Sequence, residues 1–269
     1  MIALEDNAAD VIGKAQRGLG VSDSQLAERA GVEADAIRRA RNGDMAEQVA
    51  QKIASVLGLD ASALLRLARG DYDPQVDKID GLAVFNTEYG DMRVNAYLAW
   101  DPRSRTAVAF DSGADCAGML EKISNEQLTV EVILLTHSHP DHVEDLQRLQ
   151  QATRAPVYIS ERESASGAEG IQEGREFRVG ALHIRSLLTW GHSRGGMTYV
   201  VTGLAKPVAV VGDALFAGSM GGGNVSYKDA LDTNREKILT LPDDTIICPG
   251  HGPLTTVANE KANNPFFPS

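Results

Sequence analysis

One stretch of the sequence predicts the fold: Leu134-Leu135-Thr136-His137-Ser138-His139-Pro140-Asp141-His142. The apolar run 132–135 is typical of a buried strand, and side chains alternate along a strand, so His137 and His139 point to the same side. Pro140 is tolerated in the first turn of a helix, so we expect the aspartate and the last histidine to begin one. Imidazole and carboxylate groups suit zinc, iron or manganese. The stretch therefore predicts a metal site where a strand turns into a helix.

Three later turns each carry one further residue of a metal-binding type. They are Thr189-Trp190-Gly191-His192, Gly212-Asp213 and Pro249-Gly250-His251-Gly252, and each follows an apolar run. Glycine permits a tight turn and a close approach of the backbone to a site. Together the four strand ends offer seven candidate ligands, enough for two adjacent metals: His137, His139, Asp141, His142, His192, Asp213 and His251. The sixth histidine, His183, lies in an alternating run beside Arg185, which predicts a solvent-facing strand residue.

The second part of the chain, 73–269, mixes short strands with helices. Apolar or alternating runs punctuated by Gly, Pro, Asp and Asn predict strands at 82–89, 95–100, 106–110, 132–136, 157–159, 182–187, 198–201, 208–211 and 245–248. Helical patterns lie at 114–123, 142–151 and 228–240. This mixture predicts a layered α/β body.

The first part of the chain, 1–72, is helical in character. Its pattern predicts five short helices at 7–18, 22–30, 33–41, 46–57 and 61–68. Ser22 and Gln25 fit a capping box, and Asp60 can cap the last helix. Gly31 and Gly58 are placed as C-terminal stops. We therefore expect an additional all-α N-terminal domain, with a boundary near 70–74.

Composition narrows the class of partner. The chain has 269 residues, with 26 Lys and Arg against 37 Asp and Glu, a formal net charge of −11. Such a chain is a poor general binder of phosphate backbones and anionic membranes, so we expect a small-molecule partner. The sequence has neither a signal-peptide pattern nor a bilayer-spanning run, and its two cysteines lack CxxC spacing, which predicts a cytoplasmic protein with reduced, buried thiols. Assembly into a homo-oligomer is left open.

The seven candidate ligands resemble the five motifs of the metallo-β-lactamase superfamily, over roughly residues 80–269. Within that superfamily the chain is most similar to compact glyoxalase II-like hydrolases, through 132–142, 189–201, 212–219, 241–256 and 264–267. The resemblance implies an αββα sandwich with metals at one edge. It further implies one metal held by His137, His139 and His192, a second held by Asp141, His142 and His251, and Asp213 bridging both.

The implied reaction is hydrolysis of a thioester or an ester. Two divalent ions, expected to be zinc with iron or manganese as alternatives, would share a hydroxide that attacks the carbonyl carbon. Asp141 and Asp213 would be the catalytic residues, because they orient the metals and the nucleophile. Tyr227 and Lys228 are weak candidates for substrate contacts, and the start of a surface helix is the favoured interpretation of both.

The sequence departs from better-known relatives at two places near the site. Val143-Glu144-Asp145 stands where the family often has a Gly-Gly pair, and the loop 218–224 lacks an Arg often found there. In addition, 18 residues follow His251 (269 − 251), so we do not expect the C-terminal helical domain with which larger glyoxalase II enzymes hold glutathione.

Two other enzyme classes fit the same ligand set. Persulfide dioxygenases resemble this subfamily and use one iron, which His137, His192 and Asp213 would hold here. A lactonase would use two metals, as the thioesterase does. Metal identity, stoichiometry and oxygen uptake distinguish the dioxygenase from the hydrolases.

A non-enzyme alternative comes from the N-terminal helices. Residues 22–41 resemble a Cro-like helix-turn-helix, in which 33–41 would be the recognition helix with Arg38, Arg39 and Arg41. Residues 1–70 carry nine Lys and Arg and ten Asp and Glu, a net charge of 9 − 10 = −1, which is weak for a DNA binder. The alternatives are therefore a metal- or ligand-sensing transcription regulator, and a module used for dimerisation or for covering the site. We favour the second.

Overall fold

Two six-stranded β-sheets face each other in the computed structural model, which describes residues 2–268. The first sheet has the order β1 (Leu82–Tyr89), β2 (Met92–Trp100), β3 (Thr106–Phe110), β4 (Thr129–Leu134), β5 (Val157–Ser160) and β6 (Ala168–Ile171). The second has the order β12 (Thr255–Thr256), β11 (Ile246–Pro249), β10 (Val208–Gly212), β9 (Met197–Thr202), β8 (Leu182–Leu188) and β7 (Glu176–Val179). Strands β3 to β6 are parallel, and so are β10 and β11; every other pair is antiparallel.

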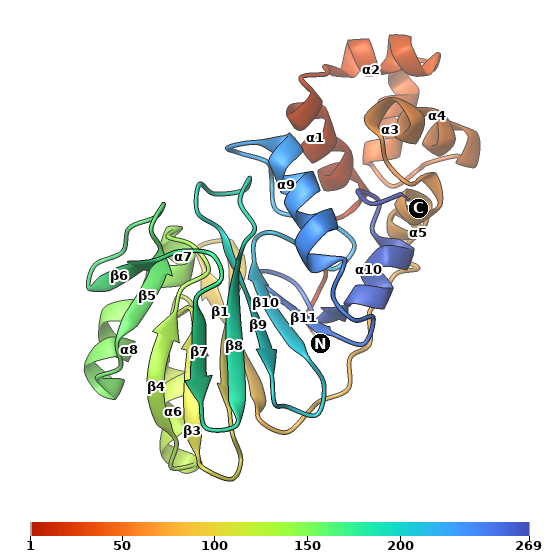
Figure 1. Ribbon diagram of the computed structural model, residues 1–269. Helices are drawn as coiled ribbons and strands as arrows, with labels where there is room; N and C mark the ends of the chain where they lie inside the picture. Colours follow the sequence, from red (N-terminus) through yellow and green to blue (C-terminus); the bar gives the residue numbers. More distant parts are fainter. Residues whose placement is uncertain (1, 269) are drawn as a thin grey trace.

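Alternating side chains give each sheet two apolar faces. In β3, Val108 and Phe110 belong to the core between the sheets, whereas Ala107 and Ala109 belong to the outer core. A strand that is apolar on both faces is covered on both sides, which is why these strands read as nearly continuous apolar runs. Helices α6 (Ala117–Asn125) and α8 (Leu146–Thr153) cover the outer face of the first sheet (Figure 1).

The outer face of the second sheet is covered by one group of helices, and a second group packs against that first group (Figure 1). One group is α9 (Tyr227–Thr233), the π-helix η1 (Asn234–Ile238) and α10 (Val257–Asn263). The other is the N-terminal helices, α1 (Ala8–Leu19), α2 (Asp23–Ala30), α3 (Ala34–Arg41), α4 (Glu47–Leu57) and α5 (Ala61–Arg69), at one end of the molecule beside α9 and α10 (Figure 1). Ala209 and Val211 of β10 share one apolar cluster with both groups. The predicted two-sheet α/β fold is confirmed, and the N-terminal region is helical as expected; its standing as a separate domain stays a prediction.

The five N-terminal helices begin and end close to their predicted positions. The Ser22 hydroxyl accepts a hydrogen bond from the backbone of Gln25, the Gln25 side chain accepts one from Ser22, and Asp60 caps α5 through the backbone of Ala63. These caps satisfy backbone groups that the first helical turn leaves unpaired.

Several boundaries in the second part were predicted wrongly. The helix expected at 142–151 is two helices, α7 (Pro140–Val143) and α8, because Asp145 instead accepts hydrogen bonds from the backbone of Cys116 and from Arg148. The helix expected at 228–240 becomes a π-helix after Thr233. Prediction missed β6, β7, β12 and α10, because these short, largely polar segments carry little apolar periodicity.

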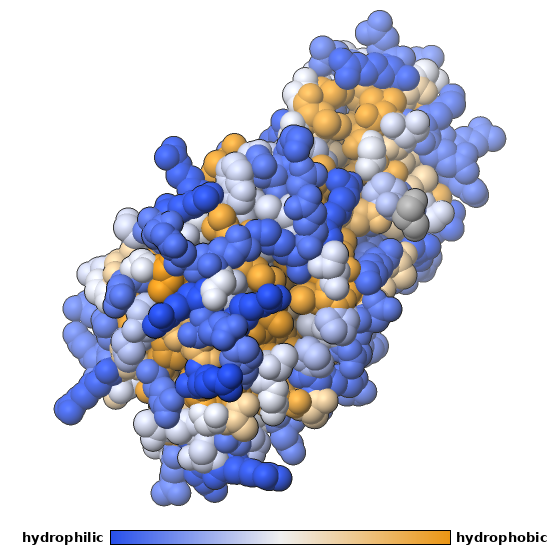
Figure 2. All heavy atoms as spheres, in the orientation of Figure 1, coloured by the Kyte–Doolittle hydropathy of each residue, from blue (hydrophilic) through white to orange (hydrophobic). Residues whose placement is uncertain are grey.

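The surface is mixed in polarity. Hydrophilic side chains are spread over the visible face, and apolar atoms show between them over the strands and the N-terminal helices (Figure 2). Cys116 and Cys248 are both free and buried, as expected. Among residues 2–268, no helix combines the length and the apolar character needed to cross a bilayer.

Candidate metal centre

All seven candidate ligands meet at one edge of the sandwich. His137, His139, Asp141 and His142 lie in the segment from the end of β4 through α7, and His192, Asp213 and His251 follow β8, β10 and β11. Because β8, β10 and β11 run in the same direction, their carboxyl ends meet at that edge. His137, His142 and Asp213 are at most 7% exposed.

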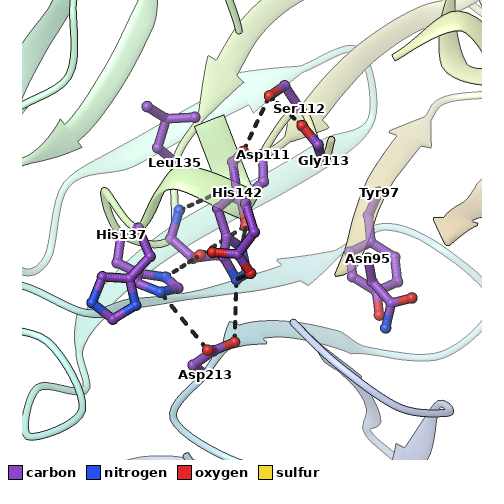
Figure 3. A network of polar contacts seen from close by, with 12 residues as sticks. Asn95, Tyr97, Asp111, Ser112, Gly113, Leu135, His137, His142 and Asp213 are labelled. Carbon is purple, nitrogen blue, oxygen red and sulfur yellow. Dashed lines mark hydrogen bonds and ion pairs between the residues drawn. The ribbon is translucent and has the colours of Figure 1, made fainter. Parts of the chain in front are cut away.

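The ligand atoms form two groups around one carboxylate. His137, His139, His192 and Asp213 make the first group, and Asp141, His142 and His251 make the second; within each, the ligand atoms lie within 4.8 Å of one another. Asp213 Oδ2 is 3.3 Å from His192 Nε2 and 3.5 Å from His251 Nε2. Its Oδ1 is 3.3 Å from His142 Nε2 (Figure 3). Asp213 therefore lies between the groups, where a bridging ligand belongs.

Orphaned polar atoms at the centre show that this geometry fits metal ions. His137 Nε2, His142 Nε2 and Asp213 Oδ1 are buried and have no hydrogen-bond partner among the described residues. Buried polar groups without partners are costly, and native proteins rarely keep them. Imidazole nitrogens and carboxylate oxygens suit zinc, iron or manganese. The donor set therefore fits one or two divalent ions.

Contacts at the Nδ1 atom fix the orientation of three of the imidazole rings. The Nδ1 atom of His142 lies 2.8 Å from Asp111 Oδ2, that of His251 lies 2.6 Å from the backbone oxygen of Arg93, and that of His192 lies 3.0 Å from the backbone oxygen of Gly222. An Nδ1–H that donates outward leaves Nε2 free to face the centre. His139 differs, because its Nδ1 is the atom that faces His192 Nε2, at 3.0 Å.

Asp111 is the main site residue that sequence reasoning missed. Its carboxylate accepts hydrogen bonds from the backbone N–H and the hydroxyl of Thr136, both at 2.7 Å, and faces His142 (Figure 3). It thus ties the strand end before His137 to a ligand of the second group. The signal was present, since Asp111 directly follows the predicted strand 106–110, but no histidine accompanies it.

Gly250 lets the backbone approach the centre. A Cβ atom at this position would lie 2.1 Å from Asp213 Oδ1 and 2.7 Å from His142 Cε1, closer than atoms can pack. Any side chain there would displace the Asp213 carboxylate. The glycine before His251 is therefore required by space, as the sequence pattern indicated.

The electrostatics of the centre favour a cation. Burial lowers the pKa of His142, but the carboxylate of Asp213 outweighs burial and raises this pKa to about 10. Burial also opposes the charge on His251, yet Asp213 and the hydrogen bond to Asp141 raise the pKa of His251 to about 11. Burial and the charge of His142 hold the pKa of His137 well below its ordinary value. In the metal-free chain, two protons therefore occupy positions that metal ions would take.

The loop after Asp213 is fixed by the N-terminal segment. Asp6, 7% exposed, accepts a hydrogen bond from Ser219 Oγ at 2.5 Å and pairs with Lys14, whose ammonium also donates to the backbone oxygen of Met220 at 2.8 Å. The same ammonium lies 4.9 Å from the centre of the Phe216 ring. The first helix therefore contacts the loop that leads from the bridging aspartate to Gly222, the partner of His192.

The remaining candidates lie outside the ligand cluster. Tyr227 begins α9 and packs its ring towards Phe266, and Lys228 pairs with Asp232 on the surface of the same helix. Contact of either residue with substrate stays a prediction. His183 is partly exposed on β8, 3.1 Å from a carboxylate oxygen of Glu176, in line with its expected position at the surface.

Comparisons with known proteins agree with this geometry. A model of the metallo-β-lactamase superfamily matches residues 89–251. The probable metallo-hydrolase YqgX of Bacillus subtilis is 32% identical over 204 residues, which is 66% of this chain and 94% of that protein. The hydroxyacylglutathione hydrolase GloC of Haemophilus influenzae is 30% identical over 200 residues, which is 65% of this chain and 93% of that protein. The crystal structure of ETHE1 from Myxococcus xanthus has a TM-score of 0.60 at 27% identity, covering 68% of this chain and 83% of that one. The chain belongs to the metallo-β-lactamase superfamily.

Proposed function

We propose that this protein is a metal-dependent hydrolase that cleaves a thioester or an ester with two divalent ions. One observation carries the proposal: the second ligand group is complete and buried, and it meets the first at Asp213. A mononuclear site on His137, His192 and Asp213 would have no use for a buried Asp141, His142 and His251. Without an ion there, His142 and His251 would stay protonated beside Asp213 and Asp141.

Seven residues would hold the two ions. His137, His139 and His192 would hold one ion, Asp141, His142 and His251 the other, and Asp213 would bridge them. Two such ions, expected to be zinc, would supply Lewis acidity and a nucleophilic hydroxide at neutral pH.

The chain's own contribution is orientation and protection from water. Asp111 and the backbone oxygens of Arg93 and Gly222 fix three imidazole rings, so the ligand geometry exists before substrate arrives. Fixed dipoles of this kind need no rearrangement during the reaction. His142 and Asp213 are buried, which keeps bulk water away from the second group.

The named relatives support the hydrolase class. The protein from H. influenzae is a hydroxyacylglutathione hydrolase by name, and hydroxyacylglutathione is a thioester. The lactonase alternative needs the same two ions, so a substrate panel separates it from the thioesterase. The dioxygenase alternative needs iron and only the first group.

A variant of the second group tests the proposal against the dioxygenase. His251→Ala removes one ligand of the second ion and leaves His137, His192 and Asp213 intact. Wild-type and variant protein are loaded with zinc, iron or manganese and assayed for hydrolysis of thioesters, esters and lactones, and for oxygen uptake with a persulfide. We expect hydrolysis in the wild type and its loss in the variant. Oxygen uptake that survives in the iron-loaded variant, without hydrolysis by either protein, would exclude the hydrolase.

The N-terminal helices do not enter this proposal as a DNA-binding module. Arg38 and Arg39 both pair with Asp35 in the same helix, Arg39 also lies 3.9 Å from Asp44, and Arg41 pairs with Asp23 at 2.8 Å. Their positive charge is thus balanced locally, which weakens attraction to phosphates. We propose instead that these helices support the loop beside the metal centre.

A further inference from the structure

We propose that the N-terminal segment Ile2–Asp6 forms one wall of the substrate cleft, and that Glu5 selects substrates whose group beside it is neutral or cationic. Anionic groups such as the carboxylates of glutathione would be disfavoured. This inference rests on the proposed hydrolase function and names the substrate class for that same site.

A cavity of about 550 Å³ lies beside the second ligand group. Residues 2–5 line one side of it, and Asp91, Met92 and Arg93 of the β1–β2 hairpin line the other. Gly252, the residue after His251, also lines it. The backbone oxygen of Arg93 is the one that accepts from His251 Nδ1. Gly252 and Arg93 thus place the cavity next to His251, although the seven candidate ligands are not themselves part of its lining.

The position of Glu5 is fixed by its neighbours. Asp6 is tied to Ser219 and Lys14, and Asn7 caps α1 through the backbone of Ala9 at 2.7 Å. A Cβ atom on Gly252 would lie 3.1 Å from the backbone nitrogen of Glu5 and 3.4 Å from its Cβ, so the two residues are in close contact. Burial raises the pKa of the Glu5 carboxyl and the charge of His251 lowers it, which reflects the same proximity.

The charges of the lining set the preference. Among residues 2–268, the Glu5 carboxylate has neither a hydrogen bond nor an ion pair, so it is available to a ligand. Arg93 is the cationic residue among those that line the cavity. Its guanidinium already donates one hydrogen bond to Glu88 at 2.6 Å and two to Asn86. Lys14, close to Glu5, is paired with Asp6. Within the part of the chain that the structure describes, the lining thus offers the unpaired carboxylates of Glu5 and Asp91 and no unpaired Lys or Arg, which favours an ammonium over a carboxylate in the ligand group beside Glu5.

Thiol binding tests this charge preference without requiring turnover. The full chain is loaded with cobalt(II), and the thiolate-to-cobalt absorption band is titrated with thiocholine (cationic), N-acetylcysteamine (neutral) and glutathione (anionic). We expect wild-type protein to bind thiocholine more tightly than glutathione. Glu5→Lys should shift the ratio of the two dissociation constants by about tenfold towards glutathione, and Glu5→Gln by less, since unit charges a few ångströms from a ligand act at this scale.

A matched variant controls for net charge. Glu28 is exposed on α2, so Glu28→Lys makes the same charge change away from the cleft and should leave the ratio unchanged. Cobalt content measured for each variant shows that the centre is intact. A ratio that Glu5→Lys leaves unchanged overturns the proposal, whichever thiol binds better. A shifted ratio in a protein that hydrolyses no thioester or ester would instead reject the hydrolase function and keep the cleft.

Discussion

Replacing Asp111 with asparagine should weaken one metal position selectively. Asp111 faces His142, a ligand of the second group, directly, and it reaches the first group through the Thr136 hydroxyl, which lies 3.1 Å from His137 Nδ1. Its backbone has φ 57°, in the left-handed region that aspartate and asparagine both tolerate. The substitution therefore changes hydrogen bonding with little effect on the backbone.

The expected losses of stability and of metal affinity in Asp111→Asn follow from the hydrogen bonds at Asp111. The carboxylate faces three groups, the two donors of Thr136 and His142 Nδ1, and an asparagine offers only one oxygen to them. One buried donor left unpaired costs about 1–3 kcal/mol of stability. Loss of the partner that orients a ligand imidazole weakens metal binding by roughly 10–100-fold. We expect the second ion to be affected and the first to stay bound.

Competition with a chelator measures the two positions separately. Wild-type protein, Asp111→Asn and the control Asp115→Asn are titrated with a chromophoric chelator, and the metal retained is determined by elemental analysis. Asp115 is four residues along the chain, is exposed and pairs with Arg148, so its substitution should change neither ion. Equal weakening of both ions, or none, in Asp111→Asn would refute the reasoning.

Three further predictions concern the ion pair of Lys14 and Asp6, the protons released when metal binds, and the close approach of Gly250 to Asp213. Lys14→Met leaves the buried carboxylate of Asp6 without its cation and should lower the free energy of unfolding, measured in urea, by about 3 kcal/mol. Adding Asp6→Asn to this variant should recover part of the lost stability. An unchanged urea midpoint in Lys14→Met would show that the ion pair contributes nothing to stability. Because the pKa of His142 is raised to about 10 and that of His251 to about 11, both hold a proton at pH 8. Metal binding at that pH should therefore release about two protons from these imidazoles, in addition to any from metal-bound water. A calorimetric heat that does not depend on the ionisation enthalpy of the buffer would contradict this. Gly250→Ala should weaken metal binding at least about tenfold, because a Cβ there meets Asp213; chelator competition that matches wild type would disprove the steric reasoning.

The metal site could be predicted from sequence because its signals are local. Each candidate ligand follows an apolar run, and the carboxyl ends of neighbouring strands of one direction meet at one edge. His192, Asp213 and His251 therefore meet at one end of the second sheet, whereas His137 and His142 follow β4 of the first sheet and join them through the packing of the two sheets. Asp111 obeys the same rule, but a lone aspartate after a strand is common, and only the distance to His142 distinguishes it.

The place of the N-terminal helices could not be predicted in the same way. Their spacing and caps follow from local pattern, whereas their packing depends on pairs such as Asp6 and Ser219, 213 positions apart. A single buried carboxylate near the start of a chain gives no sign of its partner. Likewise, Glu5 reads as an ordinary polar residue in sequence, and only the contact with Gly252 places it beside the metal centre.

Metal stoichiometry tests the two-ion centre most directly. Elemental analysis of the loaded full chain and of His251→Ala, after gel filtration and with protein quantified by amino-acid analysis, gives ions per chain for each. The two-ion account predicts two divalent ions per chain in the wild type and one in the variant. One ion per chain in both proteins would contradict it.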